Sequence, residues 1–473
     1  MSDTARIEAL AAAARPLEPD ADARAAMMAA VTAHAERFLE GLPERPTYDG
    51  AGGGAPPVFA ETPGAIETAL AHIARHIEDP GIATASGRFL GYIPGGGLFH
   101  AALGDFLAAV SNKYAGFTPA APGAVKLENS CVHFLAQTVG FPATAGGSLT
   151  SGGSIANLAA IVAARDARDP KGGGAVYSAP TAHHCVDKAL RIAGRAEAPR
   201  RTLPVDANYR IDAAALDAAL AQDRKDGVRP WLVVASAGTV DTGSVDPLDD
   251  IADICARHDV WMHVDGAYGG LFMLCPEGRA ALKGIERADT LAVDPHKTLF
   301  LPYGTGAVLA RDGRTLRAAF SATADYLTEF AAHDDISPSD LSPELTRHFR
   351  ALRLWLPLQL TGVAAFRAAQ SEKIALARYM HARLSEMPGW DAGQPPDLSV
   401  LAFRYRPATG DIDAFNGRLT KHLQDQGRAF FSGTRIRGRV HIRAAILSFR
   451  THLEHVEEAL AVLNEAARAL EAE

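Results

Sequence analysis

Between residues 100 and 320 the chain alternates short, continuous apolar segments with longer segments of helical spacing. The helical segments include 154–168, 213–221 and 247–257. Uninterrupted apolar segments of strand length are typical of a parallel sheet with helices on both faces. In such α/β sheets, ligands bind at the carboxyl ends of the strands. We expect strands at 175–178, 231–236, 260–265, 290–294 and 306–310.

The two flanks of this region have patterns of their own. Residues 1 to about 45 are rich in Ala, Glu and Arg and predict one or two amphipathic helices. Beyond Phe349, a helical stretch to about residue 384 precedes a smaller α+β pattern, with strands at 400–405 and 440–444 and helices at 412–426 and 453–470. We therefore expect an N-terminal helical segment at 1–95, a large domain at 96–345 and a small C-terminal domain at 346–473.

The composition excludes several classes of protein. The net charge of −8 gives no reason to expect nucleic acid or an anionic membrane as a partner. No apolar stretch reaches membrane-spanning length, and the first residues lack the basic and apolar regions of a signal peptide. The four cysteines have neither metal-type CxxC spacing nor the number that a disulfide framework needs. We expect a cytoplasmic protein without a metal centre.

Asp265 closes the predicted strand 260–265. A buried carboxylate is unfavourable unless it meets a cation or strong donors. A protonated pyridine nitrogen, as in pyridoxal phosphate, would supply that cation and act as an electron sink. The alternative is an aspartate that caps the next turn.

Lys297 follows the strand 290–294 directly and has no acidic residue four places away on either side. Apolar residues come after it, at 299–301. Burial in such surroundings would lower the pKa of its amine and make the amine nucleophilic, as a Schiff-base lysine requires. The alternative is a surface lysine whose stem lies along apolar neighbours.

Three other stretches could surround a ligand. Ser151-Gly152-Gly153-Ser154 precedes a predicted helix, where backbone N–H groups bind anions, although a simple helix cap has the same pattern. His183 could stack on an aromatic ligand or lie on the surface. The loop 87–97 combines aromatic residues with Gly and Pro, which suits either a rigid wall over a pocket or a turn with an aromatic anchor.

Together these stretches carry a resemblance to a known family. The motifs occur in the order TSGGSIANL, AHHCVDKAL, GTVDTGSVDPL, HVDGAYGG and DPHK. This order resembles the pyridoxal-phosphate-dependent group II amino-acid decarboxylases, from about Phe89 to the C-terminal helix. The resemblance implies the aspartate-aminotransferase-like fold (fold type I), an α/β fold with a mostly parallel, seven-stranded type of sheet. It also implies a homodimer with shared active sites, in which segment 1–95 packs on the partner subunit.

The resemblance further implies roles for individual residues. Lys297 matches the lysine that binds the cofactor covalently, Asp265 the partner of the pyridine nitrogen, and His183 the histidine that stacks on the ring near the substrate carboxylate. The remaining matches are Ala267 beneath the ring, Thr239 near the cofactor, Ser151, Gly152, Gly153, Ser154 and His296 around the phosphate, and Tyr92, Ile93 and Pro94 on the substrate side.

The chain also departs from the family pattern. Many members carry a proton-donating tyrosine in a mobile loop, but no tyrosine occurs here between Leu327 and Phe349. We predict that 328–342 is a mobile lid and that His333 is its candidate acid. Smaller departures are Ile155 where many members have Glu, Cys185 for a usual serine, Asp294 for an asparagine near the phosphate, Thr298 for tryptophan or methionine, and Ile93 and Gly95 on the substrate side.

The favoured function is decarboxylation of an L-amino acid to its amine and carbon dioxide. An aromatic or otherwise apolar substrate is expected, because the loop that carries Tyr92 and Ile93 has one basic residue, Arg88. An aldehyde-forming oxidative deaminase and an aminotransferase, with Arg443 or Arg450 as a carboxylate clamp, are the alternatives. A non-catalytic scaffold is disfavoured by the motif residues themselves.

Overall fold

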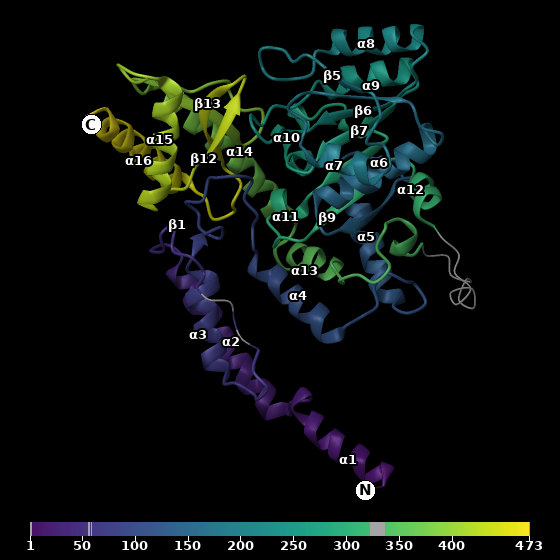
Figure 1. The fold of residues 1–473 in the computed structure, drawn as a ribbon, viewed down its shortest axis with the longest axis vertical. Helices are drawn as coiled ribbons and strands as arrows, with labels where there is room; N and C mark the ends of the chain where they lie inside the picture. The colour runs from purple at the N-terminus through teal and green to yellow at the C-terminus, as the bar shows by residue number, and fades with distance from the viewer. Residues whose placement is uncertain (1, 55–56, 58, 322–335, 473) are drawn as a thin grey trace.

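The computed structural model describes residues 2–54, 57, 59–321 and 336–472. A large body surrounds one sheet, a smaller body surrounds a second sheet beside it, and an N-terminal helical arm projects from the base of the smaller body (Figure 1). None of the described helices has the length and apolarity that crossing a bilayer requires.

The large sheet has seven strands, and its neighbours follow the order β3-β9-β8-β7-β6-β4-β5. Strands β8, β7, β6, β4 and β5 are parallel, whereas β9 is antiparallel to both β3 and β8. This confirms the predicted, mostly parallel sheet. In chain order, the strands are β3 (Gly146–Thr150), β4 (Ala175–Ser178), β5 (Arg200–Thr202), β6 (Pro230–Ser236), β7 (Trp261–Gly266), β8 (Thr290–Val293) and β9 (Gly306–Ala310).

Helices cover both faces of this sheet. On β6, Leu232 and Val234 belong to the core beneath α6 and α7, whereas Val233 and Ala235 belong to the core that includes α8 and α9. Side chains of a strand alternate between faces, so a strand buried on both faces is apolar throughout. The helices of this body are α4 (Phe99–Ser111), α5 (Pro122–Thr138), α6 (Gly153–Arg168), α7 (Cys185–Ile192), α8 (Ala213–Lys225), α9 (Leu248–Arg257), α10 (Pro276–Ala281), α11 (Pro295–Thr298) and α12 (Gly313–Phe320).

The small sheet is antiparallel, with the order β10-β11-β13-β12. The strands predicted at 400–405 and 440–444 are confirmed, and so are both helices. The helical stretch after Phe349 is two helices, because Gly362 adopts φ 75° between them. The elements are α13 (Ala351–Thr361), α14 (Val363–Glu386), β10 (Trp390–Asp391), β11 (Val400–Tyr405), α15 (Ile412–Gln426), β12 (Ser432–Ile436), β13 (Arg439–Ala445) and α16 (Leu453–Glu471).

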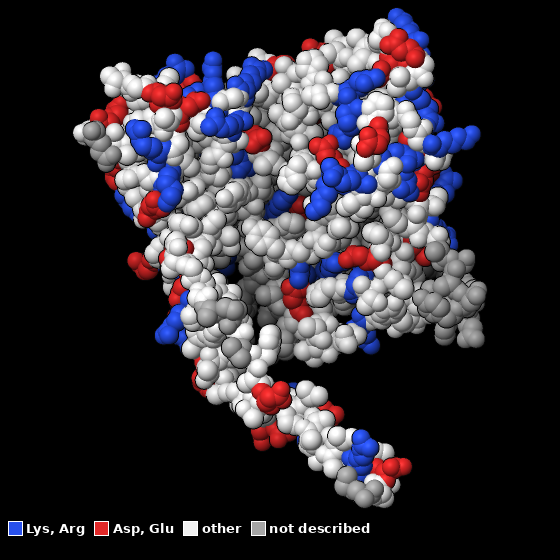
Figure 2. Space-filling view, viewed as in Figure 1, with Lys and Arg blue, Asp and Glu red and all other residues white. Residues whose placement is uncertain are grey.

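The N-terminal arm consists of α1 (Asp3–Ala14), α2 (Ala21–Gly41) and α3 (Ile66–Ile73), and none of these helices has a buried residue. Two short strands, β1 (Tyr48–Asp49) and β2 (Gly81–Ile82), pair near its base. On the face drawn in Figure 2, groups of both charges are interspersed along the arm and the two bodies. The proposed domain boundaries at residues 95 and 345 remain predictions.

Candidate functional site

A cavity of about 300 Å³ lies at the carboxyl ends of β6, β7 and β8, next to the first turn of α6. The parallel arrangement brings these ends to one edge of the sheet, as expected for a ligand site in this fold class. Ten predicted site residues line this cavity: Ser151, Gly152, Gly153, Ser154, His183, Thr239, Asp265, Ala267, His296 and Lys297.

The turn between β3 and α6 forms one wall, and at Gly153 this wall has no room for a side chain. A Cβ added to Gly153 would lie 2.9 Å from both Ala267 Cβ and Asp294 Oδ2. The first N–H groups of a helix lack helical acceptors, and the helix dipole favours an anion there. Ser151 and Ser154 flank the same wall. This wall therefore suits a phosphate group.

Asp265 lies at the carboxyl end of β7 and is 9% exposed. Its Oδ1 accepts the N–H of Ala267 at 3.1 Å, and its Oδ2 lies 3.9 Å from Cys185 Sγ, a weak donor. A buried carboxylate with such weak partners leaves negative charge directed at the cavity, which suits a cationic ring nitrogen.

Lys297 lies in α11, immediately after β8, and its Nζ is 3.0 Å from Asp294 Oδ2. The expectation of a lowered lysine pKa is wrong for this structure. Burial lowers the pKa of Lys297, but the carboxylates of Asp294 and Asp265 raise it by more, so its net shift is upward. Asp294 lies three places before the lysine, a spacing that on a helix also brings two side chains together.

Asp294 is 2% exposed, and its Oδ1 has no hydrogen-bond partner among the described residues. The ion pair with Lys297 therefore holds the other oxygen only. Asp294 Oδ2 lies beside both Lys297 and Gly153 of the phosphate wall. A cofactor bound to Lys297 would draw the amine away from this ion pair and weaken the attraction between the two charges.

Two histidines complete the cavity. His296 Nδ1 donates to the carbonyl of Thr305 at 2.7 Å, and burial lowers the pKa of this imidazole. His183 Nδ1 accepts the N–H of Cys185 at 3.2 Å, and burial lowers its pKa as well. Lowered pKa values favour the neutral imidazole at neutral pH, and a neutral ring stacks on an aromatic ligand without charge repulsion from Lys297.

The remaining predicted residues do not join this group. Tyr92, Ile93 and Pro94 are not among the residues that line the cavity, and Tyr92 is 57% exposed. His333 and positions 328–335 of the predicted lid lie outside the described residues. The described end of that segment, 336–342, packs on the protein, with Leu341 buried and Ser337 Oγ accepting the N–H of Thr118 at 3.0 Å.

Sequence reasoning overlooked several residues of the cavity wall, namely Asn157, Thr181, Ser236, Gly238, Val240 and Tyr268. Asn157 carried a usable signal, because an asparagine inside a helical pattern needs a local partner. Its Nδ2 donates to the carbonyl of Gly153 at 2.8 Å, and its Oδ1 pairs with His263 Nε2 at 2.7 Å. It thus fixes the first turn of α6 against β7.

Comparison with known proteins supports the same chemistry. Residues 54–406 match the model of a family described as pyridoxal-dependent decarboxylase conserved domain. Among curated relatives, an aromatic-L-amino-acid decarboxylase from Bacillus atrophaeus is 36% identical over 80% of each chain. An L-2,4-diaminobutyrate decarboxylase from Rhizobium meliloti is 33% identical over 78% of this chain and 75% of its own. The crystal structure of Oryza sativa TDC with PLP and tryptamine matches with a TM-score of 0.89 and 26% identity, over 96% of this chain and 99% of that one.

Proposed function

Because the chain belongs to the pyridoxal-dependent decarboxylases, we propose that this pyridoxal-phosphate-dependent amino-acid decarboxylase acts on an aromatic or otherwise apolar L-amino acid. The observation that supports this function best is the convergence of Lys297, Asp265 and the glycine wall on one cavity. The aldehyde-forming and aminotransferase alternatives are less favoured, because the matched family and the relatives at 36% and 33% identity are decarboxylases.

The cavity fits pyridoxal phosphate by its donor set. The wall at 151–154, together with His296, suits the phosphate, and the Asp265 carboxylate suits the pyridine nitrogen. When bound, the cofactor supplies an electron sink for the bond to the departing carboxylate. Lys297 supplies the amine that holds the cofactor covalently, and Thr239 and Ala267 border the ring.

The other proposed roles concern the substrate. With the cofactor bound, His183 would cover its ring and would orient the substrate carboxylate. Asp265 keeps a negative charge near the ring nitrogen throughout the reaction, which favours the protonated ring. An acid then returns a proton to Cα, and His333 is the proposed donor, although it lies outside the described residues.

A homodimer with shared active sites is part of this proposal. The arm leaves apolar side chains exposed, including Leu10, Met28 and Val31, and α4 exposes Phe106 and Val110. Apolar surface that a monomer leaves uncovered is typical of subunit interfaces. Tyr92, the exposed residue of the stretch 92–94, would then contact substrate in the partner's cavity. The cytoplasm is the proposed location.

The dimer predicts a specific loss of assembly. Changing Phe106 and Val110 together to Asp should convert the dimer to monomers, because burying two carboxylates in an apolar interface is costly. Sedimentation equilibrium of the full chain measures this. The matched control is Ile412→Asp, since Ile412 is an exposed apolar residue on α15. A wild-type chain that sediments as a monomer at micromolar concentration would refute the dimer.

The substrate preference predicts the product profile. Arg88, the basic residue of the loop, donates to the carbonyls of Pro43 and Arg45, so it does not serve the cavity. Without a paired cation, desolvation of a side-chain carboxylate opposes binding of glutamate. We expect kcat/KM for tryptophan, tyrosine or phenylalanine to exceed that for glutamate by about 100-fold or more.

Mass spectrometry of amines formed from each proteinogenic amino acid and from 2,4-diaminobutyrate tests this preference. Aldehyde and peroxide are measured in the same reactions, because the aldehyde-forming alternative produces both. Faster turnover of glutamate would contradict the proposal and implicate Arg443, whose buried guanidinium donates to the carbonyl of Tyr92. Faster turnover of 2,4-diaminobutyrate would also contradict it.

A further inference from the structure

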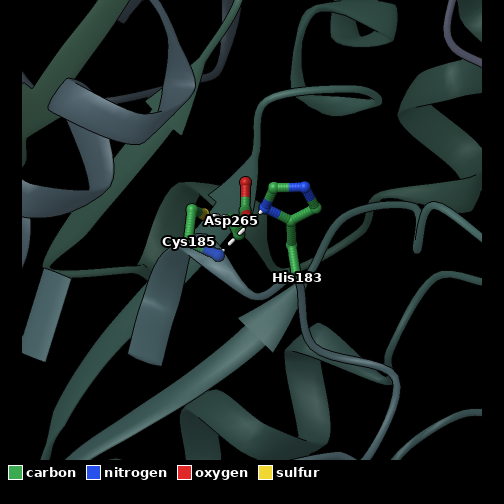
Figure 3. Close-up of side chains that lie close together, drawn as sticks. All are labelled: His183, Cys185 and Asp265. Atoms are coloured by element: carbon green, nitrogen blue, oxygen red, sulfur yellow. Dashed lines mark hydrogen bonds between the residues drawn. The ribbon is translucent and has the colours of Figure 1, made fainter. Parts of the chain in front are cut away.

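His183, Cys185 and Asp265 form a compact cluster beside the proposed cofactor ring (Figure 3). They come from the loop after β4, the first residue of α7 and the end of β7. One ligating atom from each lies within 4.8 Å of the other two. Within the described ranges, this is the one group of three such side chains at this spacing.

The donor set is that of a transition-metal site. Imidazole, thiolate and carboxylate all bind Zn²⁺, and the thiolate favours Zn²⁺ and softer ions over Mg²⁺ or Ca²⁺. Sulfur and oxygen ligands on one tetrahedral zinc ion stand about 3.6 Å apart, given bond lengths of about 2.3 and 2.1 Å. The distance between Cys185 Sγ and Asp265 Oδ2 is 3.9 Å, so a small shift brings both onto one ion.

The three ligands are held in place by their neighbours. Asn157 Nδ2 lies 3.5 Å from Cys185 Sγ, and the N–H of Ala267 holds Asp265 Oδ1 at 3.1 Å. His183 Nδ1 faces Cys185 and accepts its backbone N–H at 3.2 Å, so a metal ion bound by this nitrogen would replace that hydrogen bond. Preorganised ligands bind a metal ion more tightly than mobile ones, because less order is lost on binding.

We infer that the cofactor-free chain binds one Zn²⁺ or a similar thiophilic divalent cation through His183, Cys185 and Asp265, and that this ion excludes the cofactor. The Cys185 thiol gives up its proton to solvent as the sulfur–metal bond forms, and no electron is transferred. The bound ion would exclude the cofactor because the cofactor ring also needs Asp265 and His183. This inference rests on the proposed cofactor roles of these two residues but not on which amino acid is the substrate.

No local motif indicates this site, because its ligands do not follow the spacing of a metal motif. Asp265 lies 80 residues after Cys185. The resemblance adds that serine is usual at the position of Cys185. The proposed metal site therefore depends on the Cys185 sulfur, and Cys185→Ser tests it directly by removing that ligand.

The experiment titrates cofactor-free full-length chain with Zn²⁺, by calorimetry, and with Cd²⁺, by its thiolate charge-transfer absorbance. We expect one ion per wild-type chain. Cys185→Ser should weaken binding about 100-fold or more and abolish the charge-transfer band, since even outer-shell changes cost 10–100-fold. Cys255→Ser, which changes another buried cysteine on α9, should bind as wild type does.

Competition with the cofactor gives a second readout. Zn²⁺ should slow the loading of pyridoxal phosphate into the wild-type chain but not into Cys185→Ser, and the loaded wild-type enzyme should bind Zn²⁺ at least about tenfold more weakly. Equal Zn²⁺ affinity of the wild-type and Cys185→Ser chains would overturn the inference. Equal affinity of the loaded and cofactor-free wild-type chains would also overturn it, and this comparison needs no variant to fold. Neither result depends on amine formation. The proposed function and the proposed metal site can therefore be refuted independently of each other.

Discussion

Asp265→Asn is expected to lower kcat by about a thousandfold while the cofactor still binds. The carboxylate lies at the carboxyl end of β7, is nearly buried and has weak partners. It can therefore stabilise a positive ring nitrogen far better than a neutral amide can. One pKa unit of the ring nitrogen corresponds to about 1.4 kcal/mol, or tenfold in rate, and buried pairs shift by several units.

The test compares kcat with cofactor content for wild type, Asp265→Asn and Asp265→Glu. The glutamate variant keeps the charge and should retain more activity than the asparagine variant, although its longer side chain displaces the carboxylate. Cofactor content is read from the visible absorbance of the purified protein. A fully loaded Asp265→Asn enzyme with kcat within tenfold of wild type would show that the ring nitrogen does not need this carboxylate.

The sequence predicted the parts of the fold whose patterns are local. Strands β4, β6, β7 and β8 are mostly apolar, and each lies within one residue of the expected bounds. Strand β5, with the sequence Arg-Arg-Thr, and β3, which begins with two glycines, lack that pattern and were missed. The direction of β9 was also beyond prediction, because apolar runs are alike in parallel and antiparallel neighbours.

The candidate site could be predicted as a set because parallel strands end at one edge of the sheet. What could not be predicted depends on side-chain geometry between distant residues. The contact between Cys185 and Asp265 requires the fold. The raised pKa of Lys297, in contrast, depends chiefly on Asp294, three places before it in the sequence. The exposure of Tyr92 is a second feature that could not be predicted, because nothing local distinguishes a loop over the chain's own cavity from one that faces away.

Lys297→Ala is expected to abolish covalent cofactor attachment and to lower kcat by about a thousandfold or more. The amine is the proposed attachment point, and general acid–base catalysis by such a group contributes about 10²–10⁴-fold by itself. Borohydride reduction followed by peptide mapping should place the pyridoxyl group on Lys297 in the wild type. Its appearance on Lys188 or Lys126, or near-normal activity of the alanine variant, would refute the assignment.

Asp294→Asn is the matched comparison, because it keeps the amine and removes its ion-pair partner at 3.0 Å. The carboxylate raises the pKa of Lys297, so the asparagine variant should have a lower lysine pKa. Because only the neutral amine attacks an aldehyde, a larger neutral fraction at a given pH should speed cofactor attachment, and the rate profile should shift to lower pH. Stopped-flow absorbance measures the rate of cofactor loading from about pH 6 to about pH 9. These rates show both whether attachment is faster and whether its pH profile has shifted. A profile that does not move, or that moves to higher pH, would mean that Asp294 does not control the charge of Lys297.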